Sequence, residues 1–485
     1  MVNESSSIRV PQRSAGLEIP VFAIPRPGDL GAGDTGCVHQ VIDLAAMLGL
    51  GSLTLLPIQE TVKGNDPSVP VSVFSLDPML LDLHPKVLPD LTEEAFHKLA
   101  GDQATSQLKP NNQLPYHRVK RLKLDLLWQA FEHFWKHHHQ TGSQRARDYH
   151  RFCIEHATWL PDYCLYRLLM DFEQGKERWE DWSDEYACYG DAKRFIADIA
   201  ANKPAAVERQ LAYYGYVQWV AYRQWQGVRE HADECQLQLI TDVHCAISPH
   251  CAEFFKSPES FRLESGQSAV WDGDLLEHLE NRLMGLSGVF SQFRVPDFRK
   301  TTSLLEGVDD ETIKKFIATA AIAAESDSSS TPIKVAWESL PAMAMQSSSL
   351  WPAPNGRLNP PMPGAQMSFS SFGGNSLRRL WSNNMLFRRR LKNQWAVNTS
   401  TYDLSTTSAL MRKLLQYPAR HIQISYQDLA GLENEPGVSW LARYDKGVDD
   451  LLEEPAWEDF CNEFRKILKH TGRLARSPEK ISKTE

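Results

Sequence analysis

Short, mostly apolar runs that end on a carboxylate recur along this chain, and they constrain its fold more than any other feature. Ile333, Val335, Ala336 and Trp337 form one such run, with Glu338 directly after it. Runs of this kind are typical of buried strands in a parallel sheet. The same design recurs in segments that end near Asp242, Asp297 and Asp403. We therefore predict a parallel sheet whose strand exits carry acidic side chains.

Helical segments separate these strands. Residues 16–23 alternate as a strand, residues 36–48 have helical spacing, and residues 52–57 form the next strand. A strand, a helix and a strand within roughly forty residues are typical of a βαβ unit. The glycine-rich turn at residues 27–34 has neither the dinucleotide nor the P-loop order of residues. The predicted fold class is α/β, a (β/α)8 TIM-type barrel.

The chain of 485 residues exceeds the usual size of one core, and its middle changes character. Large apolar side chains recur there at helical spacing among charges, which predicts a large helical insertion. We divide the chain into residues 1–90 (first part of the barrel), 91–230 (helical insertion), 231–475 (remainder of the barrel and C-terminal helices) and 476–485 (disordered tail).

Several further elements follow from local patterns. We predict a short strand at residues 79–83 and helices at residues 274–286 and 312–324. Strands are predicted at residues 288–299 and 394–403. The Pro- and Gly-rich segment between Pro341 and Gly374 is predicted to be a long loop that shapes a cleft.

Composition excludes some classes of function. A net charge of -9 and a pI near 6.0 argue against nucleic-acid binding. Residues 41–58 are the most apolar segment, but Asp43 and two glycines interrupt it, so we expect no membrane span. Residues 1–14 lack an apolar signal-peptide region. Eight scattered cysteines are typical of reduced thiols, so we expect a cytoplasmic protein.

We expect no metal site. His244-Cys245 and His250-Cys251, with Cys235 nearby, are the candidates for zinc ligands. Adjacent residues on a strand point to opposite faces, so neither pair easily supplies two ligands, and no CxxC spacing is present. The histidine run at residues 137–139 is expected at the surface of a helix.

Paired carboxylates at the open face of an α/β barrel suggest glycoside chemistry. One carboxylic acid protonates the leaving oxygen. In retaining enzymes a second carboxylate, about 5–5.5 Å away, attacks the sugar. The 14 tryptophans are a generous supply of flat faces for a sugar-binding cleft, although most are expected in the core.

Five segments of the N-terminal half carry distinctive motifs. Residues 13–34 hold a strand and a GAGD turn, and residues 53–83 hold LTLLPI and NDPSVPVSVFSLDPMLLDL. WLPDY follows at residues 159–163, QWVAYRQW at 218–225 and QLITD at 238–242. In order, they resemble the GIGD turn, the LWQVLPL…NPLLIDL stretch, WLEDYALF, QWLFFRQW and the IGD strand of amylomaltases, the 4-α-glucanotransferases of glycoside hydrolase family 77.

The resemblance continues through the C-terminal half. AWESL at residues 336–340 resembles AEDLG, which implies that Glu338 is the general acid/base. TSTYDLSTT at residues 399–407 resembles GTHDNDTT, which implies that Asp403 stabilises the transition state. Tyr402 stands where that motif has His. ENEPG at residues 433–437 resembles MNxPG and implies a sugar-binding role for Asn434.

The position of the nucleophile is ambiguous in the sequence. The family's nucleophilic Asp lies in RIDHFRG, where this chain has RVPDFR at residues 294–299. Without a gap, Pro296 replaces it; with a shift of one residue, Asp297 takes the role beside Arg294. The aromatic residue of the family's GYGDSPY loop is missing between Lys63 and Val69. The acceptor-side stretch is shortened to Ser-Gly-Gln and Trp271.

The resemblance implies an enzyme that transfers α-1,4-glucan segments between maltodextrins without a cofactor or a metal. Glu338 would protonate the glycosidic oxygen, Asp297 would form the covalent intermediate, and Asp403 would bind sugar hydroxyls. The substrate-binding residues would be Asp242, Arg294, Tyr402, Trp271 and Asn434. The alternative is a catalytically inactive α-glucan-binding protein on the same fold, and a hydrolase is a third possibility.

Overall fold

The structure is a computed structural model that describes residues 13–61, 69–101, 114–176, 178–242, 246–264, 268–271, 292–294, 334–335, 367–369, 404–416, 421–432 and 442–475.

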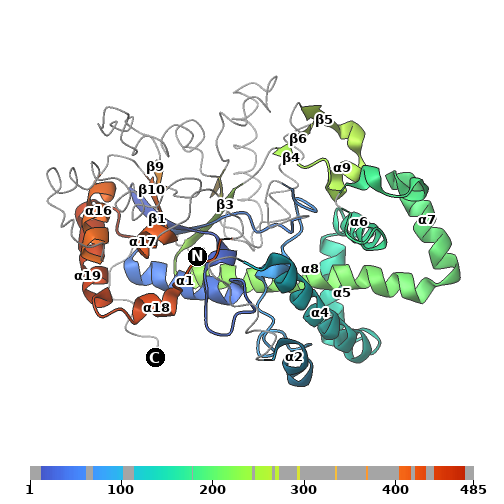
Figure 1. Cartoon of the computed structure of the whole chain (residues 1–485), viewed down its shortest axis with the longest axis horizontal. Helices are drawn as coiled ribbons and strands as arrows, with labels where there is room; N and C mark the ends of the chain where they lie inside the picture. Colours follow the sequence, from blue (N-terminus) through green and yellow to red (C-terminus); the bar gives the residue numbers. More distant parts are fainter. Residues whose placement is uncertain are drawn as a thin grey trace, which may run out of the picture.

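Within the described residues, seven parallel strands form the central sheet, in the order β8-β7-β3-β2-β1-β10-β9 (Figure 1). Leu17 of β1 pairs with Leu53 of β2 on one side and with Ile424 of β10 on the other, and all three side chains are fully buried. Such strands need helices on the outside to cover them. Their bounds are β1 Ser14–Ile19, β2 Ser52–Leu55, β3 Gln238–Asp242, β7 Gln292–Arg294, β8 Lys334–Val335, β9 Met367–Phe369 and β10 His421–Ser425.

Helix α1 (Thr35–Leu48) connects β1 to β2, as the sequence predicts. The Asp34 side chain caps it by accepting from the Cys37 N–H at 3.2 Å, and Gly49 ends it with φ 79°. Glycine adopts this left-handed conformation without strain. A Cβ atom on Gly33 would lie 2.0 Å from the Val21 carbonyl oxygen. The turn before α1 therefore requires glycine for close backbone approach.

A group of helices occupies the middle of the chain and gathers at one end of the molecule, away from the C-terminal helices (Figure 1). The longest, α8, packs against α1 and also against α4, α5, α6 and α7, so it links the helical group to the sheet. The bounds are α2 Glu93–Ala100, α4 Tyr116–Phe134, a π-helix Trp135–His139, α5 Gln144–Glu155, α6 Leu160–Phe172, α7 Tyr189–Asn202 and α8 Pro204–Glu234.

Smaller elements complete the described chain. A three-stranded antiparallel sheet of described residues has the order β4-β6-β5. Its strands are β4 Ala246–Ile247, β5 Phe261–Glu264 and β6 Ser268–Trp271, with α9 Ala252–Lys256 between β4 and β5. The C-terminal helices are α16 Leu404–Leu415, α17 Tyr426–Leu429, α18 Val448–Leu452 and α19 Trp457–His470. The short 3-10 helices are Val21–Ala23, Pro78–Leu80, Trp179–Asp181, Asp184–Tyr186 and Pro258–Ser260.

Two local predictions are wrong. The strand predicted at residues 79–83 is a 3-10 helix, Pro78–Leu80, because Asp77 caps it by accepting from the Met79 N–H at 2.9 Å. The segment predicted to be a long loop up to Gly374 contains strand β9. Both are short apolar stretches, whose pattern does not distinguish the two conformations. The predicted helices at 274–286 and 312–324, the strand at 394–403 and the tail lie outside the described residues.

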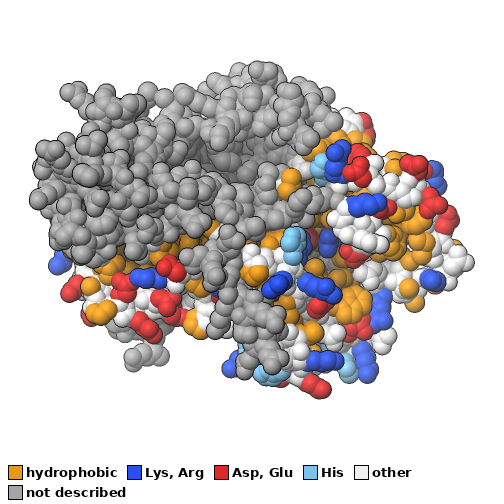
Figure 2. Space-filling model, viewed as in Figure 1, with side chains coloured by type: hydrophobic (Ala, Val, Ile, Leu, Met, Phe, Trp, Pro, Cys, Tyr) orange, Lys and Arg blue, Asp and Glu red, His pale blue; other side chains and the backbone are white. Residues whose placement is uncertain are grey.

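The surface of the helical group carries charges of both signs, interspersed with apolar side chains on the face shown in Figure 2. None of the described helices is both long enough and apolar enough to cross a membrane.

Candidate functional site

The carboxyl ends of the parallel strands meet at one edge of the sheet, and two predicted substrate-binding positions lie there. Asp242 ends β3, Arg294 ends β7, and the two are Cα partners across these neighbouring strands. β8 pairs with β7 through Lys334 and Val335, directly before the segment that contains Glu338. The sheet therefore brings the exits of β3, β7 and β8 together, at the edge where parallel α/β folds place their ligands.

The other predicted site residues do not join this edge in the described part of the chain. Trp271 ends β6 opposite Phe261 of β5, so it belongs to the antiparallel sheet. The five remaining residues lie outside the described residues: Asp297, Glu338, Tyr402, Asp403 and Asn434.

The segment after β2, residues 56–61 and 69–83, begins at the same edge of the sheet, and we call it the β2 loop. Two glutamines of α8 hold its backbone. Gln218 accepts from the Leu76 N–H at 2.9 Å and donates to the Leu76 carbonyl at 3.1 Å. Gln224 makes the same pair of bonds to Asp82, at 3.0 and 2.8 Å. Both glutamines belong to the QWVAYRQW motif, so that motif supports this loop.

A buried acid anchors the start of the β2 loop. Glu60 is fully buried and accepts from the Tyr163 hydroxyl at 2.6 Å. The Arg167 guanidinium lies 3.6 Å from its other oxygen. Burial alone would lower the pKa of Arg167, but the charge of Glu60 raises it above its usual range. Arg167 thus stays protonated and balances Glu60, and Tyr163 of the WLPDY motif acts as a second support.

Asp77, within the same loop, has a buried carboxyl group with a raised pKa. One oxygen caps the 3-10 helix, and the other, Oδ2, has no hydrogen-bond partner among the described residues. Burial raises the pKa of Asp77 to about 6, against the opposing charge of Lys120. This side chain therefore changes charge close to neutral pH. The sequence analysis did not identify Asp77. The signal available for it was the Asp77-Pro78 pair, which is typical of the start of a helix.

A buried ionic network ties the β1–α1 turn to the β2 loop. Arg26 donates to Asp34 at 2.8 Å and to Asp82 at 2.5 Å. Lys123 of α4 is fully buried and donates to the carbonyls of Met79 and Leu81 at 2.6 and 2.9 Å. Burial lowers the pKa of Lys123. The two loops at this edge of the sheet are therefore held by charged groups that have partners in the protein.

A further contact fixes the β2 loop to the antiparallel sheet region. The Ser72 hydroxyl donates to Glu253 of α9 at 2.5 Å, and the Val73 N–H donates to the same carboxylate at 3.3 Å. Burial raises the pKa of Glu253. Of the residues that the sequence analysis set aside as zinc ligands, His244 and Cys245 lie outside the described residues, and His250 lies 3.3 Å from Glu180. Glu253 and the β2 loop thus form one framework.

This parallel sheet, with helices packed around it, defines a protein of the α/β-barrel class. The model of the 4-alpha-glucanotransferase family, glycoside hydrolase family 77, matches residues 19–272. The chain belongs to this family.

Curated relatives agree with this assignment. The chain is 26% identical over 277 residues to a 4-alpha-glucanotransferase of Synechocystis, covering 54% of this chain and 49% of the relative. It is 27% identical over 266 residues to that of Aquifex aeolicus, covering 54% and 47%. The chain thus spans about half the length of these curated relatives.

Solved structures extend the likeness in fold. The amylomaltase of Streptococcus agalactiae, in complex with acarbose, has a TM-score of 0.66 at 15% identity, covering 95% of this chain and 100% of that one. The amylomaltase of Corynebacterium glutamicum has a TM-score of 0.62 at 11% identity, covering 93% and 75%. The predicted TIM-type barrel fold is confirmed. The family match ends at residue 272, however, before all three predicted catalytic carboxylates.

Proposed function

We propose that this protein is a 4-α-glucanotransferase that transfers α-1,4-glucan segments between maltodextrins by a retaining double displacement. The family match over residues 19–272 is the observation that carries the proposal. It covers the QWVAYRQW and WLPDY residues that hold the β2 loop, and the likeness in fold to amylomaltases extends it along the chain. We also infer a cytoplasmic location, which the eight scattered cysteines support.

In the proposed reaction, the carboxylic acid of Glu338 gives its proton to the glycosidic oxygen while Asp297 attacks the anomeric carbon. The glycosidic bond breaks, and a covalent glycosyl-enzyme intermediate and a shortened glucan form. The hydroxyl of a second glucan then attacks the intermediate and returns its proton to Glu338, which frees Asp297. Asp403 binds sugar hydroxyls as the ring distorts. No cofactor takes part in this reaction.

The remaining predicted residues bind substrate in this proposal. Asp242 and Arg294, which end neighbouring strands, are proposed to bind sugar hydroxyls. Tyr402 and Asn434 are proposed to hydrogen-bond sugar hydroxyls, and Trp271 is proposed as a stacking face.

A second candidate function is a catalytically inactive α-glucan-binding protein. One observation favours it: Pro296 occupies the nucleophile's place in the ungapped match to RIDHFRG. Proline has no group that can attack an anomeric carbon. Under this alternative, Glu338 and Asp403 act only as hydrogen-bond acceptors for sugar.

The deciding experiment is incubation of the purified full chain with maltotriose, followed by separation of products by size. We expect glucose and a ladder of longer maltodextrins. Glu338→Gln and Asp297→Asn should abolish the ladder, and Glu458→Gln, an exposed change on α19, should leave it intact. Maltotriose that stays unchanged while calorimetry still detects maltodextrin binding would overturn the transferase proposal in favour of the binding protein.

A further inference from the structure

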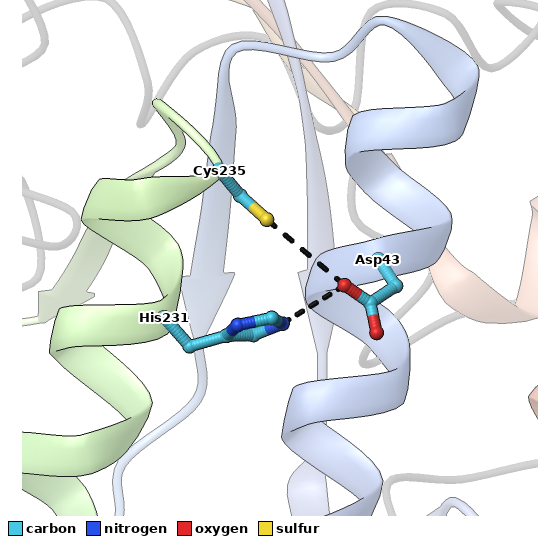
Figure 3. Close-up of side chains that lie close together, drawn as sticks. All are labelled: Asp43, His231 and Cys235. Atoms are coloured by element: carbon cyan, nitrogen blue, oxygen red, sulfur yellow. Dashed lines mark hydrogen bonds and ion pairs between the residues drawn. The ribbon is translucent and has the colours of Figure 1, made fainter. Parts of the chain in front are cut away.

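Helices α1 and α8 face each other with a pair of metal-binding side chains on each. His39 and Asp43 lie one turn apart on α1, and His231 and Cys235 lie one turn apart at the end of α8. Residues four apart lie on the same face of a helix. Because α1 and α8 pack together, Asp43 meets His231 and Cys235 in the space between them (Figure 3). His39 contacts the His231 ring from the α1 side. These four residues lie outside the motifs that carry the family resemblance.

Three of the four side chains converge on a single point. The Nε2 atom of His231 lies 2.8 Å from Oδ1 of Asp43, and the Sγ atom of Cys235 lies 3.9 Å from the same oxygen. Their ligand atoms all lie within 4.8 Å of one another. Figure 3 shows the imidazole of α8, and the thiol of the residue that follows α8, pointing across to the carboxylate on α1. One ion between the helices can contact all three after small side-chain rotations.

The imidazole of His231 packs beside a second histidine, and the group is open to water. The Nδ1 atom of His231 lies 3.9 Å from a carboxylate oxygen of Glu234, too far for a hydrogen bond. The His39 ring packs against His231 with centroids 5.0 Å apart. The Asp43 side chain is 62% exposed, which leaves room for a water ligand.

A second group of metal-ligating side chains differs from the first, because its carboxylate already has partners in the protein. Asp90, His133 and His138 also bring their ligand atoms within 4.8 Å. Arg145, however, donates to both oxygens of Asp90, at 2.6 and 2.5 Å, and the Tyr216 hydroxyl donates at 2.8 Å. A carboxylate engaged in this way has little capacity left for a cation. Among the described residues, no arginine or lysine donates to Asp43.

We propose that Asp43, His231 and Cys235 bind a divalent transition-metal ion of the zinc class, with water at the fourth position. A mixed set of nitrogen, sulfur and oxygen ligands suits zinc, whereas calcium and magnesium require oxygen ligands. On binding, the Cys235 thiol loses its proton to solvent and the thiolate bonds the metal, so binding should weaken in acid. This proposal is independent of the glucanotransferase activity.

The position of the site points to a structural role. Cys235 lies just before β3 begins, and so at the amino end of the sheet, opposite the strand exits. Features at that end of a barrel generally serve stability. A bound ion would fasten α1 to the end of α8, and a ligand that binds only the folded chain raises its stability.

Cobalt(II) titration of the full chain tests the proposal, because a cobalt–thiolate bond gives a charge-transfer absorption band. We expect the band to saturate at one equivalent and to disappear when zinc is added. Cys235→Ser should remove it, and His231→Gln and Asp43→Asn should weaken cobalt binding. Cys188→Ser is the matched control: Cys188 is an exposed cysteine that donates to an aspartate, Asp191, elsewhere on the surface, and this change should keep the band. No band in the wild type, or a band that persists in Cys235→Ser, overturns the proposal.

Thermal unfolding provides a second readout. Zinc should raise the Tm of the wild type and of Cys188→Ser by several degrees, and should leave that of Cys235→Ser unchanged. Circular dichroism in a chelator checks that each variant folds, and His231→Gln replaces Cys235→Ser if the latter does not. An equal rise in all variants would mean that zinc binds elsewhere, for example at the histidines of residues 133–139, and would also overturn the proposal.

Discussion

The middle of α8 and its C-terminal end use polar side chains in opposite ways. In the middle, polar side chains bond to the protein: the buried Tyr216, Gln218 and Tyr222 to Asp90, Leu76 and Phe74, and the half-buried Gln224 to Asp82. At the end, His231 and Cys235 face a largely exposed carboxylate across the gap to α1.

The difference follows from burial. A polar group removed from water needs a hydrogen-bond partner in the protein, because burying it unpaired costs free energy. The bonds from the middle of α8 therefore fix the shape of the β2 loop, and substitutions that remove them should destabilise the protein. A group that water reaches keeps capacity for a ligand. The same helix therefore supports the proposed glucan site through its middle and offers a separate metal site at its end.

The largest expected effect is at Asp90, whose carboxylate is fully buried between Arg145 and Tyr216. Arg145→Met removes two charge-assisted hydrogen bonds and leaves a buried charge without its counter-ion. We expect a loss of about 3–5 kcal/mol in the free energy of unfolding, measured with urea. Arg147→Met, an exposed arginine on the same helix, should change it by less than about 0.5 kcal/mol. Equal losses in the two variants would show that Asp90 does not need its arginine.

The next effect depends on pH and concerns Asp77, which follows Leu76, the residue whose backbone Gln218 holds. Its folded-state pKa of about 6 lies above the ordinary value of 3.8, so the folded chain binds more protons than the unfolded chain between these values. Its contribution to stability is therefore complete below about pH 4 and is lost as pH rises through 6. Asp77→Asn stays uncharged and can still accept from the Met79 N–H.

We accordingly expect Asp77→Asn to be more stable than the wild type at pH 7 to 8 by about 1–3 kcal/mol, and similar to it near pH 4. Urea unfolding across this range of pH measures the difference. A difference between the two proteins that does not change with pH would refute the assignment of the titration to Asp77.

The smallest effect is expected at Asp43, in a chelator. Its side chain is 62% exposed, so its ion pair with His231 contributes little to stability. Asp43→Asn should lower the free energy of unfolding by less than about 1 kcal/mol without metal. If Asp43→Asn lost as much free energy of unfolding as Arg145→Met, the end of α8 would be a structural contact like its middle, and the two regions would not differ.

Local sequence signals predicted α1 and the end of β3 correctly. Helix α1 was predicted at residues 36–48 and is observed at Thr35–Leu48, because an apolar face, the Asp34 cap and Gly49 all agree. Strand β3 was likewise predicted to end at Asp242. The 3-10 helix at Pro78 and strand β9 were missed, since a few apolar residues fit several conformations. For the candidate site, the sequence alone gave the types of residue. That Asp242 and Arg294 are partners on neighbouring strands is known only from the sheet.

The sequence by itself determined the βαβ order at the start of the chain, the acid that ends β3 and the motifs of the family, because each depends on neighbours along the chain. Only the tertiary structure decided which distant groups meet. Asp43 and His231 are 188 residues apart, and Gln218 lies 142 residues from the loop that it holds. No local period encodes such distances. These contacts form when α8 packs against α1 and β3. That packing brings the glutamines of α8 to the β2 loop and brings His231 to Asp43 in the proposed metal site.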